Sequence, residues 1–578
     1  MASLQTGAEC AIKVNQQQIR HTVSSVELQQ FIDGHHVLKV RILESRMSAR
    51  AGVFEGISDY TGFLGAPISI SLQSSGGVVD AAEALEFDGL VTKVHLENSI
   101  DSVEQVVIEA HSPTIIMDQN RTKRFFLEQT PSDIVRLVTG QYQVTVDSIP
   151  SDLGSSSPFT VQYLETDYEL TRRYGTQAGY FVFYDGKKLR MAKATGSNAV
   201  SLRFRVNLGS FTAGLGTAAL GFEAYAWNYN EKKLVSSEKP PSQAPSPAGI
   251  AAASSRASKG TFVSSALGGI RSANDMSTVD KHLETEQAAA LARMISCTGE
   301  SIVPSISVGQ AVSIESMGEL DGQYYVTCVS HNLDDSGKYS NKFTCIPMDV
   351  AHPQKYSRPR SAEIENAVVT DTNDPEGLGR VKVFFPWQAE DTGWLRLLVL
   401  HAGDSRGWFV VPEIDDEVLV AFEHGNFNRP FVLGSVWNGT DMPPAESQSD
   451  ANDVKMFQTR GGHLLLFDDK DGSETLKLMQ KDGQNSLVME LGGPSISIES
   501  EGDITIKGKT ISLETTSGDV KINSGGKSSI EASGDLELKG GMNFKAEGAV
   551  NAEIKAGAQA KLEGGAMVEI KGAIVKIN

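Results

Sequence analysis

Residues 531–572, EASGDLELKGGMNFKAEGAVNAEIKAGAQAKLEGGAMVEIKG, decide the fold of the C-terminal part of the chain. The stretch is rich in Gly and Ala, and its large apolar residues return at every eighth position. Across the whole tail, one column at this step contains Ile506, Ile522, Ile530, Leu538, Ile554, Leu562 and Ile570. Glu514 and Ala546 interrupt the column. A fixed repeat of this kind indicates a repetitive architecture.

A second apolar column lies two positions earlier, at Ile504, Val520, Leu536, Phe544 and Val568. Because side chains two residues apart point to the same face of a strand, the two columns form one apolar stripe. Glycines return at the same step, where the chain must bend tightly. They are Gly518, Gly526, Gly534, Gly557 and Gly565. Each repeat is therefore predicted to be one short strand and one turn.

The apolar stripe needs a partner, because an eight-residue repeat is too narrow to bury it. Seven large residues left in water forfeit roughly 10–20 kcal/mol per chain, and unpaired strand edges promote aggregation. Three copies wound about one axis bring the stripes together inside and pair each edge with a neighbouring chain. A parallel β-helix made by a single chain is the alternative, but its turns usually contain about 20 residues or more.

The sequence therefore predicts an intertwined triple-stranded β-helix, formed by a homotrimer, as a C-terminal needle. Its predicted core residues are Ile506, Ile522, Ile530, Leu538, Phe544, Ile554, Leu562 and Ile570. The charged residues between them are expected on the outer surface. Ile574, Val575 and Ile577 are expected near the blunt end of the needle.

The composition argues against several classes of function. The chain has 578 residues, so several domains are expected. A formal net charge of −20 argues against a nucleic-acid-binding surface, which needs clustered Lys and Arg. The cysteines are too scattered for a disulfide scaffold or a zinc site; they are Cys10, Cys297, Cys328 and Cys345. The N-terminus has no signal-peptide pattern and no run of 18 apolar residues occurs, so synthesis in the cytoplasm without a signal peptide is expected.

The rest of the chain is predicted to be mainly β. Alternating β-favouring and polar residues fill residues 10–110. TPSDIVRLVTG at 130–140 predicts a short capped helix, and TVDKHLETEQAAALARMIS at 278–296 predicts an amphipathic one. Segment 236–260 is rich in Pro, Ser and Ala and is predicted to be an exposed loop. Residues 364–439 have the turn residues and the length of a small barrel.

Several stretches resemble the VgrG and phage hub-and-spike family, the spike proteins of contractile injection machines. In the first half they are FDGLVTKVHLE, DQNRTKRFFLEQTPSDIVRLV, FTVQYLETDYELTRRYGTQAGYFVFYDGKKLRM and GKYSNKFTCIP. The most diagnostic cluster there is Gln162, Tyr163, Glu165, Thr166 and Asp167. NDPEGLGRVKVFFPWQ, WLRLLVLHAG and PEIDDEVLVAFEHGNFNRPFVLGSVWNG are similar to the family's OB-type barrel. Its landmarks are Asp374-Pro375-Glu376, Gly379-Arg380-Val381 and Pro412-Glu413-Ile414.

The resemblance implies a domain organisation and a set of partners. It implies a hub-like region with two β-barrel modules at 1–360, an OB-type barrel at 361–440, a linker at 441–460 and the spike at 461–578. A trimer of such hubs presents a pseudo-sixfold ring onto which a hexameric inner tube stacks. The implied partners are an inner tube or tube-initiator protein, baseplate proteins, a PAAR-type protein at the tip and, transiently, the target membrane.

No catalytic, cofactor-binding or metal-binding residue is predicted. Some relatives carry a wall-cleaving domain or a toxin, but segment 440–462 is too short for one and the chain ends with KGAIVKIN. DDKDG at 468–472 is interpreted as a hairpin turn, because a calcium loop requires a Glu further on at a fixed spacing. Cys328, His331 and Cys345 lack a fourth ligand at a suitable spacing, so structural roles are favoured.

The expected function is therefore mechanical: a structural central spike, not an enzyme, built into a phage-tail-like particle and released or injected with it. A type VI secretion VgrG or a phage baseplate spike is the alternative within the family. A cell-wall-degrading hub enzyme and a trimeric adhesin or fibre are alternatives from other classes.

Overall fold

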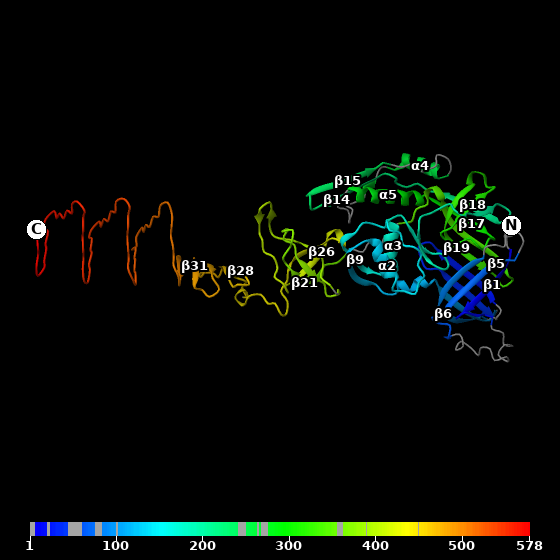
Figure 1. The fold of residues 1–578 in the computed structure, drawn as a ribbon, viewed down its shortest axis with the longest axis horizontal. Coiled ribbons are helices and arrows are strands. Elements are labelled where there is room, and N and C mark those ends of the chain that lie inside the picture. The colour runs from blue at the N-terminus through cyan, green and yellow to red at the C-terminus, as the bar shows by residue number, and fades with distance from the viewer. Residues whose placement is uncertain are drawn as a thin grey trace. The chain divides into compact units, whose positions relative to one another are not determined.

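The computed structural model describes residues 6–19, 23–43, 61–75, 84–99, 102–240, 250–262, 265–266, 276–354, 362–388, 390–448 and 450–577. The chain divides into two compact units, Met1–Pro444 and Ala445–Asn578. Strands far outnumber helices, which confirms the predicted mainly β class (Figure 1). Within the described ranges, no helix is both long and apolar enough to cross a membrane.

The first barrel is a closed ring of strands at the start of the chain. In ring order these are β3 (Val23–Phe31), β4 (Val37–Leu43), β7 (Ser102–His111), β6 (Leu85–Ser99), β5 (Pro67–Ser74), β1 (Thr6–Val14), β20 (Lys338–Pro347) and β19 (Gly322–Leu333). β19 pairs with β3 and closes the ring, while β2 (Gln17–Gln18) pairs with β1. Alternate side chains point inward, as Ile68, Ile70 and Leu72 of β5 do, and together they fill the interior.

The second barrel shares the hairpin β19–β20 with the first. Its other strands are β12 (Val200–Arg203), β18 (Ala311–Glu315), β17 (Ile295–Ser301) and β13 (Leu208–Leu215). The first residues of β19 pair with β18, and those from Cys328 onward pair with β3. A bulge between Val326 and Cys328 separates the two pairings, as expected where a strand bends from one sheet into another. These two groups of strands lie in the region 1–360, where the two β-barrel modules are expected.

Two histidines, His36 and His331, are buried in the first unit. The ring of His36 is 6.1 Å from that of Phe87 and 5.7 Å from that of Tyr184. His331 Nδ1 is 2.7 Å from the hydroxyl of Tyr339. Burial lowers the pKa of both imidazoles from 6.5 to about 3. In the folded chain both rings therefore stay neutral at mildly acidic pH, whereas in the unfolded chain they take up protons below their ordinary pKa.

Acid is expected to destabilise the first unit through these two rings. The stabilisation is fully present above pH 6.5 and is lost as the pH falls towards about 3, because the unfolded state binds the extra protons. When the pH falls from about 7.5 to about 5, protonation of each ring in the unfolded chain lowers the free energy of unfolding by about 2 kcal/mol. The variant His331→Gln removes one titrating ring, so its thermal midpoint should fall less than the parent's in calorimetry at the two pH values. An equal fall of the midpoint in the parent and the variant would show that His331 does not stay neutral in the folded chain.

A small helical layer follows the first barrel along the chain. It contains the 3₁₀ helix η2 (Pro113–Asp118), β8 (Thr122–Gln129), α2 (Pro131–Thr139), β9 (Ser157–Glu165), α3 (Asp167–Gln177), β10 (Phe181–Tyr184) and β11 (Leu189–Ala192). The helix predicted at 130–140 is confirmed as α2. The hydroxyl of Thr130 caps it by accepting from the backbone N–H of Asp133, and Ile134, Val135 and Val138 are buried.

The second barrel carries a hairpin and two helices. The hairpin is β14 (Phe222–Asn228) with β15 (Lys233–Lys239), and β16 (Ser265–Ala266) pairs with β14. The helix predicted at 278–296 is confirmed as α5 (Met276–Arg293), whose Val279, Leu283 and Ala290 face the core.

The prediction of an exposed loop at 236–260 is wrong at both ends. β15 extends to Lys239, and α4 (Ile250–Thr261) occupies the C-terminal part, while 241–249 lie outside the described residues. The Ala-rich sequence favours a helix, and its small residues allow close packing. The Ser258 hydroxyl accepts from the backbone N–H of Ala218 at 3.1 Å, and Ser254 donates to the carbonyl of Gly216.

A small barrel completes the first unit. Its sheet has the order β22 (Lys382–Phe384), β21 (Glu365–Asp371), β26 (Glu417–Phe422), β27 (Pro430–Ser435) and β23 (Arg396–Leu397), and β24 (Ala402–Gly403) forms a hairpin with β25 (Arg406–Gly407). Val369, Val383 and Phe385 lie in its core. Short 3₁₀ helices are η3 (Gly318–Leu320), η4 (Met348–Val350), η5 (Glu423–Gly425) and η6 (Ala445–Ser447).

The second unit begins with an antiparallel meander formed by one chain. Its strands are β28 (Val454–Gln458), β29 (Leu464–Asp468), β30 (Thr475–Met479), β31 (Asn485–Glu490) and β32 (Ser495–Ser500). The prediction that 461–578 is intertwined throughout is therefore wrong up to Ser500, because these strands pair with one another. The predicted linker 441–460 is also too long, since β28 lies inside it. The hairpin predicted at 468–472 is confirmed between β29 and β30.

Candidate functional site

After β32 the chain runs in short extended limbs separated by sharp bends (Figure 1). From the bend at 516–518 onward the bends return every eight residues, at 525–526, 533–534, 541–542, 549–550, 557–558, 565–566 and 573–574. The predicted glycines lie at these bends, so the predicted period of the bends is confirmed, while the pairing of the limbs as strands stays a prediction. Each limb comprises the residues between two successive bends.

The predicted needle core residues lie in the middle of the limbs. In the single chain their exposed fractions run from 63 to 89 % for Ile506, Ile522, Ile530, Leu538, Phe544, Ile554, Leu562 and Ile570. The predicted end residues Ile574, Val575 and Ile577 are also exposed. Within 501–577 no strand pairs with another segment of the same chain. An apolar stripe of this length in water is an interaction surface.

The interruption at Glu514 has a structural explanation. The preceding bend consists of residue 509 alone, so the limb begins one position early and Ile511 and Leu513 take the mid-limb places in that repeat. The next bend spans 516–518 and restores the register. Sequence reasoning at a fixed step of eight missed these two residues, although their own alternation could have identified them. The small Ala546 follows the large Phe544 in its limb, so the pair keeps the stripe apolar.

The meander presents a second apolar face. Strand pairing places Phe467, Leu476, Met489 and Ile496 in one row across the sheet. A neighbouring row on the same face contains Phe457, Leu465, Leu478, Leu487 and Ile498. Several of these side chains are exposed, including Phe467, Leu478 and Ile496. A lone sheet with such a face is only marginally stable in water, so this face also needs a cover.

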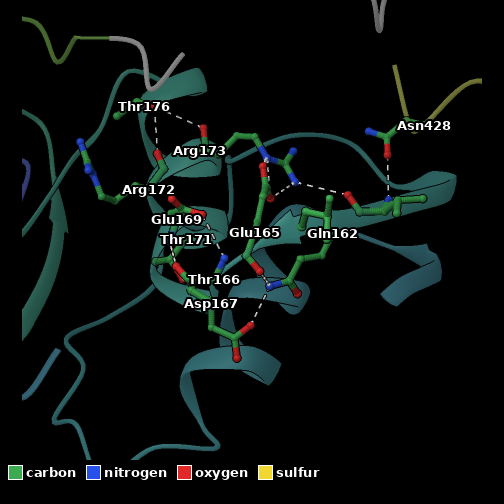
Figure 2. Close-up of polar contacts among 12 residues, drawn as sticks. Gln162, Glu165, Thr166, Asp167, Glu169, Thr171, Arg172, Arg173, Thr176 and Asn428 are labelled. Carbon is green, nitrogen blue, oxygen red and sulfur yellow. Dashed lines mark hydrogen bonds and ion pairs between the residues drawn. The ribbon is translucent and has the colours of Figure 1, made fainter. Parts of the chain in front are cut away.

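A buried polar network surrounds the start of α3 (Figure 2). The Gln162 amide donates to the Asp167 carboxylate and to the carbonyl of Glu165, both at 2.9 Å. Its side-chain oxygen accepts from Arg124 Nε at 2.7 Å. Thr166 caps the helix, because its hydroxyl accepts from the backbone N–H of Glu169 at 3.1 Å, and the Glu169 carboxylate accepts from the backbone N–H of Thr166.

An ion pair between Glu165 and Arg173 closes this network (Figure 2). Arg173 Nε and Nη2 donate to the two oxygens of Glu165 at 2.9 and 3.0 Å. Burial raises the pKa of Glu165, and the guanidinium of Arg173 opposes that rise. Both side chains are buried. The ion pair between them is the main interaction that offsets the desolvation penalty of the two charges.

The opposite face of β9 contacts the small barrel. The Tyr163 hydroxyl and Lys123 Nζ each lie 2.5 Å from Glu365 Oε1, and Trp387 Nε1 donates to Glu365 Oε2 at 3.2 Å. Burial raises the pKa of Glu365, but the hydrogen bonds from Lys123 and Tyr163 outweigh it and lower the pKa overall.

Further contacts complete this joint. The backbone N–H of Val161 donates to Asn428 Oδ1 at 2.7 Å (Figure 2), and Tyr163 stacks on Phe427 with ring centres 6.1 Å apart. The guanidinium of Arg173 lies 5.3 Å from the ring of Phe427. Tyr163 is therefore the member of the cluster at 162–167 that contacts the small barrel, and Lys123, Val161 and Arg173 complete the joint. Such a fully connected network makes a rigid joint.

The cysteine, histidine and small-barrel residues that the sequence singled out are not part of this network. His331 bonds Tyr339, while Cys345 lies opposite Cys297 in the β17–β20 pairing. Of the barrel landmarks, Asp374 and Arg380 form a bidentate pair at 3.0 and 2.7 Å that fixes the loop after β21. Hydrogen bonds from Arg380 hold the pKa of Asp374 below its usual value. Among the described residues, no group of three or more His, Cys, Asp or Glu is placed to hold a metal ion.

Comparisons with curated proteins give partial matches. The chain is 26 % identical over 216 residues to "Actin cross-linking toxin VgrG1" of Vibrio cholerae, a match that covers 32 % of this chain and 20 % of that protein. It is 32 % identical over 123 residues to "Type VI secretion system spike protein VgrG1a" of Pseudomonas aeruginosa, covering 19 % of each. The matches thus span about a fifth of these relatives.

A solved structure and two family models extend the comparison. The VgrG-containing structure of the Francisella PdpA–VgrG complex aligns with a TM-score of 0.56 at 10 % identity, over 86 % of this chain and 89 % of that one, which shows the shared fold. Residues 365–437 match the family model of the type VI secretion system/phage-baseplate injector OB domain. Residues 6–335, more than half of the chain, match the Alg8 N-terminal domain. The chain therefore belongs to the Alg8 N-terminal domain family, within the wider family of VgrG and phage hub-and-spike proteins.

Proposed function

We propose that the protein is the structural central spike of a contractile injection machine and acts as a homotrimer. The observation that carries this proposal is the exposed apolar stripe along the limbs of 501–577, with bends at a regular step. Three chains wound about one axis bury this stripe and pair every limb edge. The result is a thin shaft with few ways to yield locally under axial load.

The meander supplies the upper part of the same shaft in this proposal. Its apolar face, with Phe467, Leu478 and Ile496, turns inward against the equivalent faces of two further copies. Three sheets of one chain each then form the sides of a prism, and the limbs of 501–577 continue it by intertwining. The proposed division remains a hub at 1–360, an OB-type barrel at 361–440 and the spike beyond it, with the meander starting at Val454.

The hub provides the docking platform for the tube. Each chain contributes two barrels that share β19 and β20, so three chains present six similar modules. This number suits a hexameric inner tube or tube-initiator protein. At the other end, Ile574, Val575 and Ile577 offer an apolar end surface for a PAAR-type tip protein, and baseplate proteins surround the particle axis. The joint around Glu365 and Arg173 holds the small barrel firmly to the helical layer of the hub.

The proposed role is mechanical, and the machine is a phage-tail-like particle. A type VI secretion spike is the nearest alternative, because spike proteins of that system are among the relatives. An enzymatic role is the competing class, since one relative is named as an actin cross-linking toxin. Incubation of the purified trimer with peptidoglycan or with actin should leave both unchanged, and cleavage or cross-linking would favour the enzymatic class.

Electron microscopy of the purified chain tests the mechanical proposal. Class averages of the full chain should show a head with threefold symmetry and a thin shaft. The matched variant truncated after Ser500 should keep the head and lose most of the shaft. In purified particles, a gold label on the chain should lie on the particle axis below the tube. A label that lies radially outside would overturn the proposal and favour an adhesin or fibre.

A further inference from the structure

The outward positions of the last limbs carry two rows of alternating charge. The first row, at a step of eight, is Glu537, Lys545, Glu553, Lys561 and Glu569. The second row, two residues further on, is Lys539, Glu547, Lys555, Glu563 and Lys571. The sign changes at every step in both rows, so the charge pattern repeats every sixteen residues whereas the bends repeat every eight.

The two rows lie on one face of each limb. Within a limb, Lys555 Nζ is 2.6 Å from Glu553 Oε1, and Lys571 likewise contacts Glu569. These side chains are largely exposed, and they alternate with the apolar residues Ile554 and Ile570, which point to the other face. The charged face is therefore the outer face whenever the apolar stripe is inside.

Three intertwined copies fix which limbs become neighbours. Each bend turns a chain from one side of the shaft to the next side. When the first limb of one copy occupies a given side, the first limb of a second copy occupies the preceding side. The second copy therefore reaches the given side with its second limb. On every side of the shaft, a limb of one copy thus lies beside the following limb of another copy. Residues eight apart in sequence, such as Glu537 and Lys545, then face each other from different chains.

We propose that the two charged rows are a register surface that recognises a second copy of this chain displaced by one limb. In that register every Glu inside a row lies between two Lys, and every Lys inside a row lies between two Glu. In the alternative register, where equal limbs lie side by side, Glu537 faces Glu537 and every contact of both rows joins like charges. Each contact on an exposed surface is weak, but opposite charges stabilise and like charges destabilise directly facing strands. The whole ladder therefore discriminates the two registers. The inference rests on the proposed trimer and adds to it the alignment of the chains.

Cysteine cross-linking in the full chain tests this register. The double variant Glu537→Cys/Lys545→Cys places two thiols on facing limbs of different copies, about 5 Å apart. Oxidation should link all three chains into a covalent trimer on a non-reducing denaturing gel, and a reductant should return the monomer. The matched control Glu537→Cys/Glu553→Cys has the same number of thiols on limbs separated by an intervening strand, about 9.5 Å apart. It should stay monomeric on the gel, because that separation is beyond the reach of a disulfide.

The outcomes separate this inference from the proposed trimer. Native mass spectrometry of the same samples gives the oligomeric state before oxidation. Two results in a native trimer would overturn the register and leave the trimer intact. One is cross-linking of the single variant Glu537→Cys. The other is the absence of a link between chains in Glu537→Cys/Lys545→Cys. A single-subunit mass would overturn both. The pair Lys555→Cys/Glu563→Cys in the second row repeats the test where the first pair impairs folding.

Discussion

Replacing Leu538 by Asp is expected to abolish the trimer. Leu538 lies in the middle of its limb, in the apolar stripe, and is 63 % exposed in the single chain. In the proposed shaft, the variant brings three carboxylates into an interior with no polar partner, where each unpaired charge costs several kcal/mol. The loss of the buried Leu side chains adds about 1.5–3 kcal/mol per chain. SDS-resistant trimer, measured on unheated gels, should therefore nearly disappear.

The adjacent residue gives a matched control for this change. Lys539 lies in the same limb but on the charged face, so Lys539→Gln removes a single weak contact of the register surface and leaves the apolar stripe intact. The trimer yield of this variant should stay close to that of the parent. A normal yield of SDS-resistant trimer from Leu538→Asp would show that the stripe is not the interior. A comparable loss from Lys539→Gln would show that the assignment of faces is wrong.

The second large effect is expected at the ion pair of the hub joint. Arg173→Met leaves the carboxylate of Glu165 buried without its guanidinium, which donates to both of its oxygens at 2.9 and 3.0 Å. Removal of one partner of a buried pair typically costs about 3–5 kcal/mol. The thermal midpoint of the first unit should fall by about 3–5 °C, as measured by differential scanning calorimetry.

Two further variants decide whether the buried charge is the cause. Arg136→Met breaks the pair with Asp133 on α2, where both side chains are about half exposed, and should change the midpoint little. The double variant Glu165→Leu/Arg173→Met replaces the buried pair by apolar side chains and should recover most of the loss. A double variant as unstable as Arg173→Met alone would contradict the assignment.

The sequence predicted the local features of the fold well. The step of eight in the tail fixed the place of most bends, because the glycines and the apolar columns both follow it. The helix α2 was predictable from its cap at Thr130 and its apolar spacing. The meander was missed, although Gly-containing turns separate its strands at near-regular intervals. These strands begin about every ten residues, at Val454, Leu464, Thr475, Asn485 and Ser495, so they do not follow the step of eight.

The features that were missed depend on long-range pairing or on context. No local pattern shows that β19 serves two barrels, because the first half pairs with β18 and the second half with β3. The role of Glu365 was not predictable, since its partners Lys123 and Tyr163 lie about 200 residues earlier in the chain. Segment 236–260 has the composition of a loop, but the packing of Ser254 and Ser258 against neighbouring backbone selects a helix for α4.

The oligomeric mass of the full chain tests the central claim most directly. The claim is that residues 501–577 gain an interior only when three identical chains entwine. A native mass spectrum should therefore show a species of three copies of the 62.1 kDa chain, and it should do so at the lowest concentration that still gives signal. A species of one subunit, in which residues 501–577 nevertheless resist proteases, would contradict the account.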